Sequence, residues 1–162
     1  MSSYVLVLFF SVYLEFHYFC RAMRLKPPKI VRRLMPDLIW EIDDEDGVFL
    51  TFDDGPTPGV TEWILSTLDK YDAKATFFVL GKNVEMYPDL YRRILDAGHK
   101  VGNHTYSHQK GWGMSLERYT EDVDFANDLI HSELFRPPYA RITPAQARFL
   151  GQRYKLVMWD II

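Results

Sequence analysis

The fold is decided by Thr51-Phe52-Asp53-Asp54-Gly55-Pro56, where an apolar strand runs into two adjacent carboxylates and then a turn. Side chains alternate between the two faces of a strand, so consecutive acids share a pocket only where that alternation breaks. We therefore place Asp53 and Asp54 at the carboxyl end of a strand. One of them could hold a cation while the other moves a proton. The alternative is that both acids merely open an Asp-Gly turn.

Downstream of this stretch, apolar strands alternate with amphipathic helices. We expect strands at 75–80, 100–103, 134–136 and 155–160, and helices that begin at Thr57-Pro58, Pro88, Ser115 and Thr143-Pro144. This order predicts an α/β fold with parallel strands and helices packed outside them. Folds of this kind carry their chemistry at the carboxyl ends of the strands.

Upstream, residues 38–42 and 48–52 resemble two strands of a hairpin around an acidic turn at 43–47. A solvated turn is favoured over a metal loop, because the acidic run lacks the spaced ligands and the distant Glu of an EF-hand. Prolines at Pro27, Pro28 and Pro36 predict an irregular, extended segment from 26 to 37.

The first 22 residues are an apolar extension with three open interpretations. The run from Tyr4 to Cys20 contains Glu15 and His17, lacks a preceding basic residue, and is shorter than the roughly 20 apolar residues of a membrane span. It could be a signal peptide, a membrane anchor, or an upstream extension of a reading frame that starts at Met23, which we prefer. Membrane association would involve only residues 4–20. The sequence itself thus favours a cytoplasmic or membrane-associated location.

Length, composition and charge limit the number of domains and the classes of binding partner. A chain of 162 residues with 48% hydrophobic content can bury one core, so we expect a basic segment with the first hairpin strand at 23–47 and one main domain at 48–162. The net charge of -3 gives no sign of nucleic-acid binding, and nothing indicates a partner protein. The basic side chains of the first 35 residues are read as a solvated flank: Arg21, Arg24, Lys26, Lys29, Arg32 and Arg33.

A second cluster, His104-Thr105-Tyr106-Ser107-His108, follows the predicted strand at 100–103. Histidines four apart can share one face of a helical turn and bind one cation, although two surface histidines are the alternative. Asp54 lies at the end of another strand on the same predicted face. Three ligands of this type leave one coordination position open, which is typical of a catalytic zinc-like ion.

A third cluster, Arg136-Pro137-Pro138-Tyr139, ends a further strand. Arg136 could orient a carboxylate through a bidentate pair, or form an ordinary structural ion pair. The backbone beyond the prolines could offer an N–H to an oxyanion. Candidate substrate contacts are Tyr106, Trp112 and Pro138. The remaining histidines have no partner at metal-binding spacing and are expected at the surface or in the N-terminal segment: His17, His99 and His131.

These three clusters, in this order and at these intervals, resemble the first three motifs of the polysaccharide deacetylases with a NodB-type homology domain, carbohydrate esterase family 4. The resemblance covers about 49–160. It implies a distorted (β/α) barrel, one divalent metal ion that is usually zinc, and hydrolysis of an acetamide on an N-acetylated sugar polymer. It also implies a location in the cell envelope or outside the cell.

Carried over by position, the resemblance makes Asp53 the catalytic base and Arg136 the residue that tethers it. Tyr139 resembles the donor of the oxyanion-hole amide. The implied metal ligands are Asp54, His104 and His108.

The family's usual proton donor to the leaving amine is a histidine from a later motif, and no histidine follows His131. We therefore expect a barrel that is truncated at its C-terminus. Three functions stay open: an active deacetylase, a glycan-binding fragment or pseudoenzyme that keeps the metal without turnover, and an amidohydrolase of a small intracellular molecule.

Overall fold

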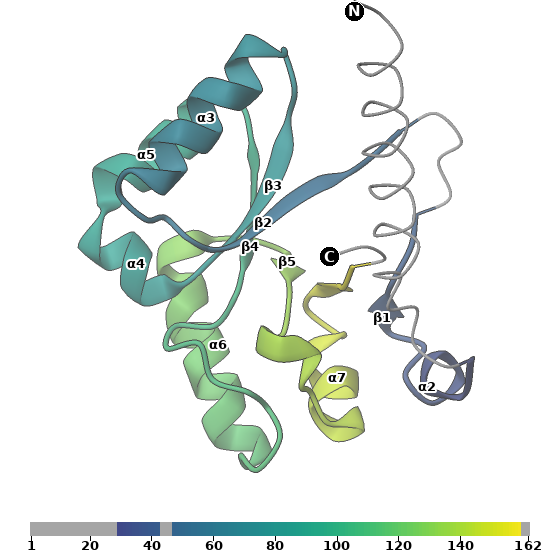
Figure 1. Cartoon of the computed structure of the whole chain (residues 1–162). Coiled ribbons are helices and arrows are strands. Elements are labelled where there is room, and N and C mark those ends of the chain that lie inside the picture. The colour runs from purple at the N-terminus through teal and green to yellow at the C-terminus, as the bar shows by residue number, and fades with distance from the viewer. Residues whose placement is uncertain (1–28, 43–46, 160–162) are drawn as a thin grey trace, which may run out of the picture.

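The computed structural model describes residues 29–42 and 47–159 (Figure 1). The apolar run at 4–20 and the acidic turn at 43–46 lie outside these residues. The helices are α2 (Lys29–Leu34), α3 (Val60–Lys70), α4 (Gly81–Met86), α5 (Pro88–Asp96), α6 (Leu116–Ile130), the 3-10 helix η1 (Pro138–Ala140) and α7 (Pro144–Leu150). The strands are β1 (Leu38–Ile39), β2 (Leu50–Gly55), β3 (Ala75–Val79), β4 (Lys100–Asn103), β5 (Leu134–Phe135) and β6 (Lys155–Val157).

The strands form one parallel sheet in the order β1-β6-β5-β4-β3-β2. Strands β2 and β5 are three places apart, which is about 14 Å in a flat sheet and beyond the reach of one arginine. Yet Arg136, directly after β5, lies 2.7 Å from Asp53 in β2. The sheet therefore curls toward a barrel. The parallel pairing of its strands confirms the predicted parallel α/β architecture.

Alternation along β3 separates the outside of the sheet from its inside. Phe77 packs with Leu65 of α3 and Ile94 of α5 in a cluster between the sheet and the outer helices. Phe78 points the other way, and its ring lies 4.0 Å from the guanidinium carbon of Arg136. Burying a side chain of this size contributes about 1.5–3 kcal/mol. The two phenylalanines thus anchor the helices on one face and the candidate site on the other.

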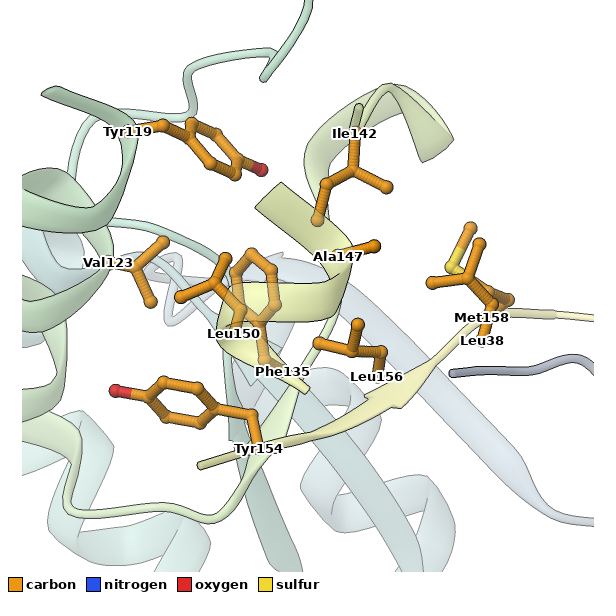
Figure 2. Close-up of a cluster of buried hydrophobic side chains, with 10 residues drawn as sticks. All are labelled: Leu38, Tyr119, Val123, Phe135, Ile142, Ala147, Leu150, Tyr154, Leu156 and Met158. Carbon is orange, nitrogen blue, oxygen red and sulfur yellow. The ribbon is translucent and has the colours of Figure 1, made fainter. Parts of the chain in front are cut away.

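A second hydrophobic cluster supports the β5–β6 side of the sheet. Figure 2 shows its side chains gathered between α6, α7 and β6, with Phe135 of β5 fully buried among them. Its members are Leu38, Tyr119, Val123, Phe135, Ile142, Ala147, Leu150, Tyr154, Leu156 and Met158. Because β5 and β6 are short, this cluster rather than a long hydrogen-bond ladder holds their carboxyl ends in place.

The predicted hairpin of 38–42 and 48–52 is wrong. Strand β1 pairs in parallel with β6, with Leu38 opposite Leu156, whereas β2 pairs in parallel with β3. The two strands therefore occupy opposite edges of the sheet. Leu38 is buried in the cluster of Figure 2 together with Leu156 of β6. This contact with the last strand determines where β1 lies, and it cannot be inferred from the turn residues next to β1.

Two helix starts also differ from the sequence expectation. Residues 29–34 form α2 instead of an extended segment. A proline restricts the residue before it and is compatible with the start of a helix, so Pro28 does not prevent a helix from beginning at Lys29. Helix α3 begins at Val60 with Gly59 as its N-cap, not at Thr57-Pro58. Thr57 instead donates its backbone N–H to the hydroxyl of Thr61.

Other predicted elements are confirmed. Ser115 caps α6 and Thr143 caps α7, each through a side-chain oxygen that accepts a backbone N–H. Pro88 begins α5, and Gly98 follows its end with a φ of 76°. Helix α4 was not expected, since its six residues are too few to show a helical hydrophobic repeat.

His99 is buried and not at the surface as expected. Its Nδ1 lies 3.4 Å from the backbone N–H of Ala75, and its ring lies 5.3 Å from that of Phe77. Burial lowers its pKa, with a further contribution from Lys74. His131 is exposed at the end of α6, as predicted. Among the described residues, no helix has both the length and the apolar character needed to cross a membrane.

Candidate metal centre and active site

A β-bulge in β2 brings the two adjacent carboxylates to one side. Asp53 pairs with Phe78 and Gly55 with Val79, so Asp54 is an extra residue in the ladder. Its φ of 69° lies in the left-handed region, which aspartate tolerates better than most residues. Asn83 of α4 donates its side-chain amide to the carbonyl of Asp54 at 2.8 Å and holds the bulge. The alternation of side chains between the two faces of the strand breaks at this acid pair, as the sequence predicted. The break lies within β2 and not after its end.

The two candidate histidines lie in a loop directly after β4, not in the helical turn that their spacing suggested. Thr105 and His108 have φ values of 68° and 61°, so two of the five residues from 104 to 108 have a left-handed backbone conformation. The buried side chain of Asn103 accepts the N–H of Thr105 at 2.8 Å and donates to the carbonyl of Val123 on α6. The loop is thereby fixed to the helix behind it.

Asp122 of α6 is a further support of this loop that the sequence did not reveal. Its carboxylate accepts the backbone N–H groups of Tyr106 and Ser107 at 3.1 and 3.2 Å, and the Ser107 hydroxyl at 2.6 Å. Charge-assisted hydrogen bonds of this kind are stronger than neutral ones. Asp122 lies in the middle of a helix with several other acids, so neither a motif nor a spacing singles it out.

Asp54, His104 and His108 converge on one point. The Oδ1 atom of Asp54 lies 3.1 Å from Nε2 of His108 and 3.5 Å from Nε2 of His104. All three potential ligand atoms lie within 4.8 Å of one another. His104 is buried while the side chain of Asp54 is 60% exposed, so the cluster opens to solvent on the aspartate side. Two imidazoles and one carboxylate with an open side fit a catalytic zinc site.

The tautomer of His104 also suits a metal ligand. Its Nδ1 lies 2.7 Å from the carbonyl oxygen of Arg136, which can only accept, so the proton is on Nδ1 and the Nε2 lone pair faces the cluster. Burial lowers the pKa of His104 to about 4. The ring is therefore neutral near pH 7, and a metal need not displace a proton from it.

Asp53 lies beside the cluster and is held by Arg136. Its Oδ1 accepts a 2.7 Å hydrogen bond from Nη1 of the guanidinium, and its Oδ2 lies 4.0 Å from Nε2 of His104. Burial raises the pKa of Asp53, and the charge of Arg136 opposes that increase. A carboxylate that is partly desolvated and fixed in direction suits proton transfer.

Arg136 is itself almost fully enclosed. Its guanidinium donates to the carbonyls of Val157 and Met158 at 3.1 and 2.8 Å, and to the hydroxyl of Thr51 at 2.9 Å. Arg136 thus forms an ion pair with Asp53 through one hydrogen bond and not through the bidentate pair that the sequence suggested. The same side chain connects β5, β6 and β2.

Tyr139 lies on the other side of the cluster. Its hydroxyl is 3.1 Å from Nδ1 of His108, and the two rings are 4.7 Å apart. Its φ of 58° turns the backbone after the buried Pro138. Within the described residues the N–H of Tyr139 has no hydrogen-bond partner, which leaves it free to donate to a bound group.

The other two candidate substrate contacts have different surroundings. The ring of Tyr106 lies 4.5 Å from that of Phe125 on α6, and its hydroxyl donates to Glu85 of α4, so its contacts are with helices and not with the cluster. Trp112 is 55% exposed, and its indole N–H donates to the carbonyl of Ile142. Trp112 and Tyr139 lie near the same guanidinium, since that of Arg141 is 5.7 Å from the centre of the first ring and 5.9 Å from that of the second.

The chain is similar to several known proteins. It is 38% identical over 127 residues to a peptidoglycan-N-acetylglucosamine deacetylase of Bacillus cereus, covering 70% of this chain and 44% of that protein. It is 36% identical over 132 residues to chitin deacetylase 1 of Saccharomyces cerevisiae, covering 75% and 42%. The chain thus spans less than half the length of both relatives.

The solved structure of the peptidoglycan deacetylase PdaC from Bacillus subtilis superposes with a TM-score of 0.66 at 37% identity, covering 69% of this chain and 57% of that one. The sequence pattern of the polysaccharide deacetylase family matches residues 41–155, a range that includes the bulge, the histidine loop and Arg136. The chain therefore belongs to the polysaccharide deacetylase family, as its three motifs predicted.

Proposed function

We propose that this protein hydrolyses the N-acetyl group of an amino-sugar polymer and releases acetate, using one divalent metal ion, with zinc preferred. The observation that carries the proposal is the placement of Asp53. Its carboxylate lies 4.0 Å from His104, beside the Asp54–His104–His108 cluster but oriented by Arg136. One carboxylate is thus available to a metal and its neighbour to a proton.

A bound zinc ion would lower the pKa of a water molecule and polarise the acetyl carbonyl. Asp54, His104 and His108 would hold it, and the exposed side of Asp54 leaves room for water and substrate. Asp53 would accept the proton of the attacking water as general base. Arg136 would keep the Asp53 carboxylate ionised and directed at that water.

The remaining groups would act on the acetamide itself. The free N–H of Tyr139 would donate to the oxyanion that forms from the acetyl carbonyl. The leaving amine needs a proton, and Asp53 gains one when water attacks. Asp53 could return that proton to the nitrogen as the C–N bond breaks, which gives acetic acid and a free amine. Transfer of the acid's proton to the amine then gives acetate and an ammonium group, so the atoms and charges balance.

The substrate class follows from the relatives. One acts on peptidoglycan by name and another on chitin, and both polymers contain N-acetylglucosamine. We therefore propose that the substrate is an N-acetylglucosamine polymer and that the protein acts in the cell envelope, where such polymers lie. This assignment favours an extended glycan over a small intracellular amide.

Acetate release tests the proposal. The chain should release acetate from N-acetylglucosamine oligomers when zinc is present, and a chelator should abolish the release. Asp53→Asn should remove turnover while zinc stays bound. Glycan binding without acetate would support the pseudoenzyme instead, and turnover of a small acetamide alone would support the third function.

A further inference from the structure

An exposed arginine lies between two exposed aromatic rings on the rim of the site. The guanidinium carbon of Arg141 is 5.7 Å from the ring centre of Trp112 and 5.9 Å from that of Tyr139. Both rings are more than half exposed, at 55% and 58%. Cation–π contacts of this kind orient a guanidinium while leaving its N–H groups free.

This rim is anchored to the core of the protein. The N–H of Gly111 donates to the carbonyl of Arg141 at 2.6 Å, and the indole of Trp112 donates to the carbonyl of Ile142 at 3.1 Å. The buried amide of Gln146 donates to the carbonyl of Gly111 at 3.0 Å. Two loops that are 30 residues apart in the chain are thereby held together, so the arginine and its two rings keep their relative positions.

The position of the rim relative to the metal centre is fixed by Tyr139. One edge of this phenol contacts His108, with 4.7 Å between ring centres, and Arg141 lies beside the same ring. A single aromatic ring therefore separates the guanidinium from a candidate metal ligand.

Arg141 has no carboxylate partner in the part of the chain that the structure describes. The exposed Arg153, in contrast, pairs with Asp124 at 3.0 Å, whereas the exposed Arg118 and Arg148 also lack a carboxylate partner among the described residues. What distinguishes Arg141 is therefore its place beside the two aromatic rings. The five N–H donors of a guanidinium match the two oxygens of a carboxylate in a bidentate pair, a geometry that the single oxygen of a sugar hydroxyl does not offer.

We propose that Arg141, Trp112 and Tyr139 form a subsite for a carboxylate-bearing sugar next to the N-acetylated sugar that reacts. The inference rests on the proposed deacetylase function and names its substrate more narrowly. The two rings contact the apolar face of the sugar, and Arg141 binds its carboxylate. The protein therefore prefers an acidic amino-sugar polymer to a neutral one.

Two glycans test this proposal. One is a set of peptidoglycan strands whose muramic acid residues carry free lactyl carboxylates, and the other is a set of neutral N-acetylglucosamine oligomers of equal length. Arg141→Gln should lower kcat/KM for the acidic strands by about tenfold or more and leave the neutral oligomers unchanged. For the acidic strands, kcat/KM of Arg141→Lys should lie between the values of wild type and Arg141→Gln, because lysine keeps the charge without the bidentate geometry. Arg92→Gln, an exposed arginine of α5, is the charge-matched control.

The outcomes separate the two proposals. An Arg141→Gln effect that is equal on both glycans, or absent from both, would overturn the subsite. If the wild-type chain hydrolyses neither glycan, the deacetylase assignment fails, and direct binding then decides the subsite. Tighter binding of acidic strands by wild type, lost in Arg141→Gln and kept in Arg92→Gln, supports it, while equal binding of both glycans overturns it.

Discussion

The Nη1 atom of Arg136 donates a 2.7 Å hydrogen bond to Oδ1 of Asp53, and this one contact joins the end of β5 to β2 across the curled sheet. The same guanidinium donates to two carbonyls after β6. The contact therefore stabilises the curvature of the sheet and also orients the candidate base. Architecture and chemistry depend here on the same side chain.

Replacement of Arg136 should damage both stability and turnover. Arg136→Met leaves the Asp53 carboxylate without its partner. Because the Asp53 side chain is 31% exposed, the loss of stability should be smaller than the roughly 3–5 kcal/mol of a fully buried pair. Urea unfolding measures this loss, and kcat for acetate release should fall by about a hundredfold or more. The double variant Asp53→Asn/Arg136→Met should be more stable than the sum of the two single effects predicts. Additive effects would show that the two groups do not interact.

Gly102→Ala should disturb the site from behind. A Cβ at this position would lie 2.4 Å from two ring atoms of Phe78, whose ring also contacts Arg136. Overpacking of this kind costs about 1–3 kcal/mol, and movement of the Phe78 ring should also lower kcat. Phe78→Leu provides space, so the double variant should recover part of the stability in a thermal unfolding experiment. A Gly102→Ala variant with unchanged Tm would contradict this packing.

Asp122→Asn should weaken zinc binding without contact to the metal. It removes a charged acceptor from two backbone N–H groups and one hydroxyl of the histidine loop. Loss of a support behind metal ligands lowers metal affinity by about 10–100-fold. A competition titration with a zinc chelator measures this affinity. Glu121→Gln, the exposed neighbour on α6, is the matched control and should bind zinc as wild type does.

Acid should destabilise the fold through His99. Burial lowers its pKa below the usual value near 6.5, so below pH 6.5 the unfolded chain takes up more protons than the folded one. The contribution of His99 to stability is therefore complete above pH 6.5 and decreases as the pH falls below it. His99→Gln should show a smaller loss of unfolding free energy between pH 7.5 and pH 5.0 than wild type. His131→Asn, at an exposed position, should behave like wild type, and an equal loss in all three proteins would contradict this role.

The sequence was informative where chemistry depends on short, ordered motifs. The acid pair lies at the carboxyl end of one strand of a parallel sheet, the histidine loop and Arg136 follow two others, and the carboxyl ends of such strands meet at one edge. This is why residues about 50 and 80 positions apart could be placed together before the structure. Helix caps such as Ser115 were equally readable, because a cap is a local contact.

The features that the sequence did not reveal depend on tertiary contacts. The position of β1 beside β6 follows from burial of Leu38 among residues near the end of the chain. The bulge at Asp54 depends on pairing with β3 and on the amide of Asn83. The histidine loop takes its shape from Asn103 and from Asp122 on α6, whose role has no local signature.

The central claim is that Asp54, His104 and His108 hold one metal ion while Asp53 stays free for proton transfer. Calorimetric titration of zinc into this chain, with matched variants, tests it most directly. Wild type and Asp53→Asn should each bind one zinc ion per chain, and that binding should be lost in Asp54→Ala and His104→Ala. Undiminished zinc binding by Asp54→Ala would show that Asp54 is not a ligand, and loss of zinc in a folded Asp53→Asn would show that Asp53 is needed for metal binding.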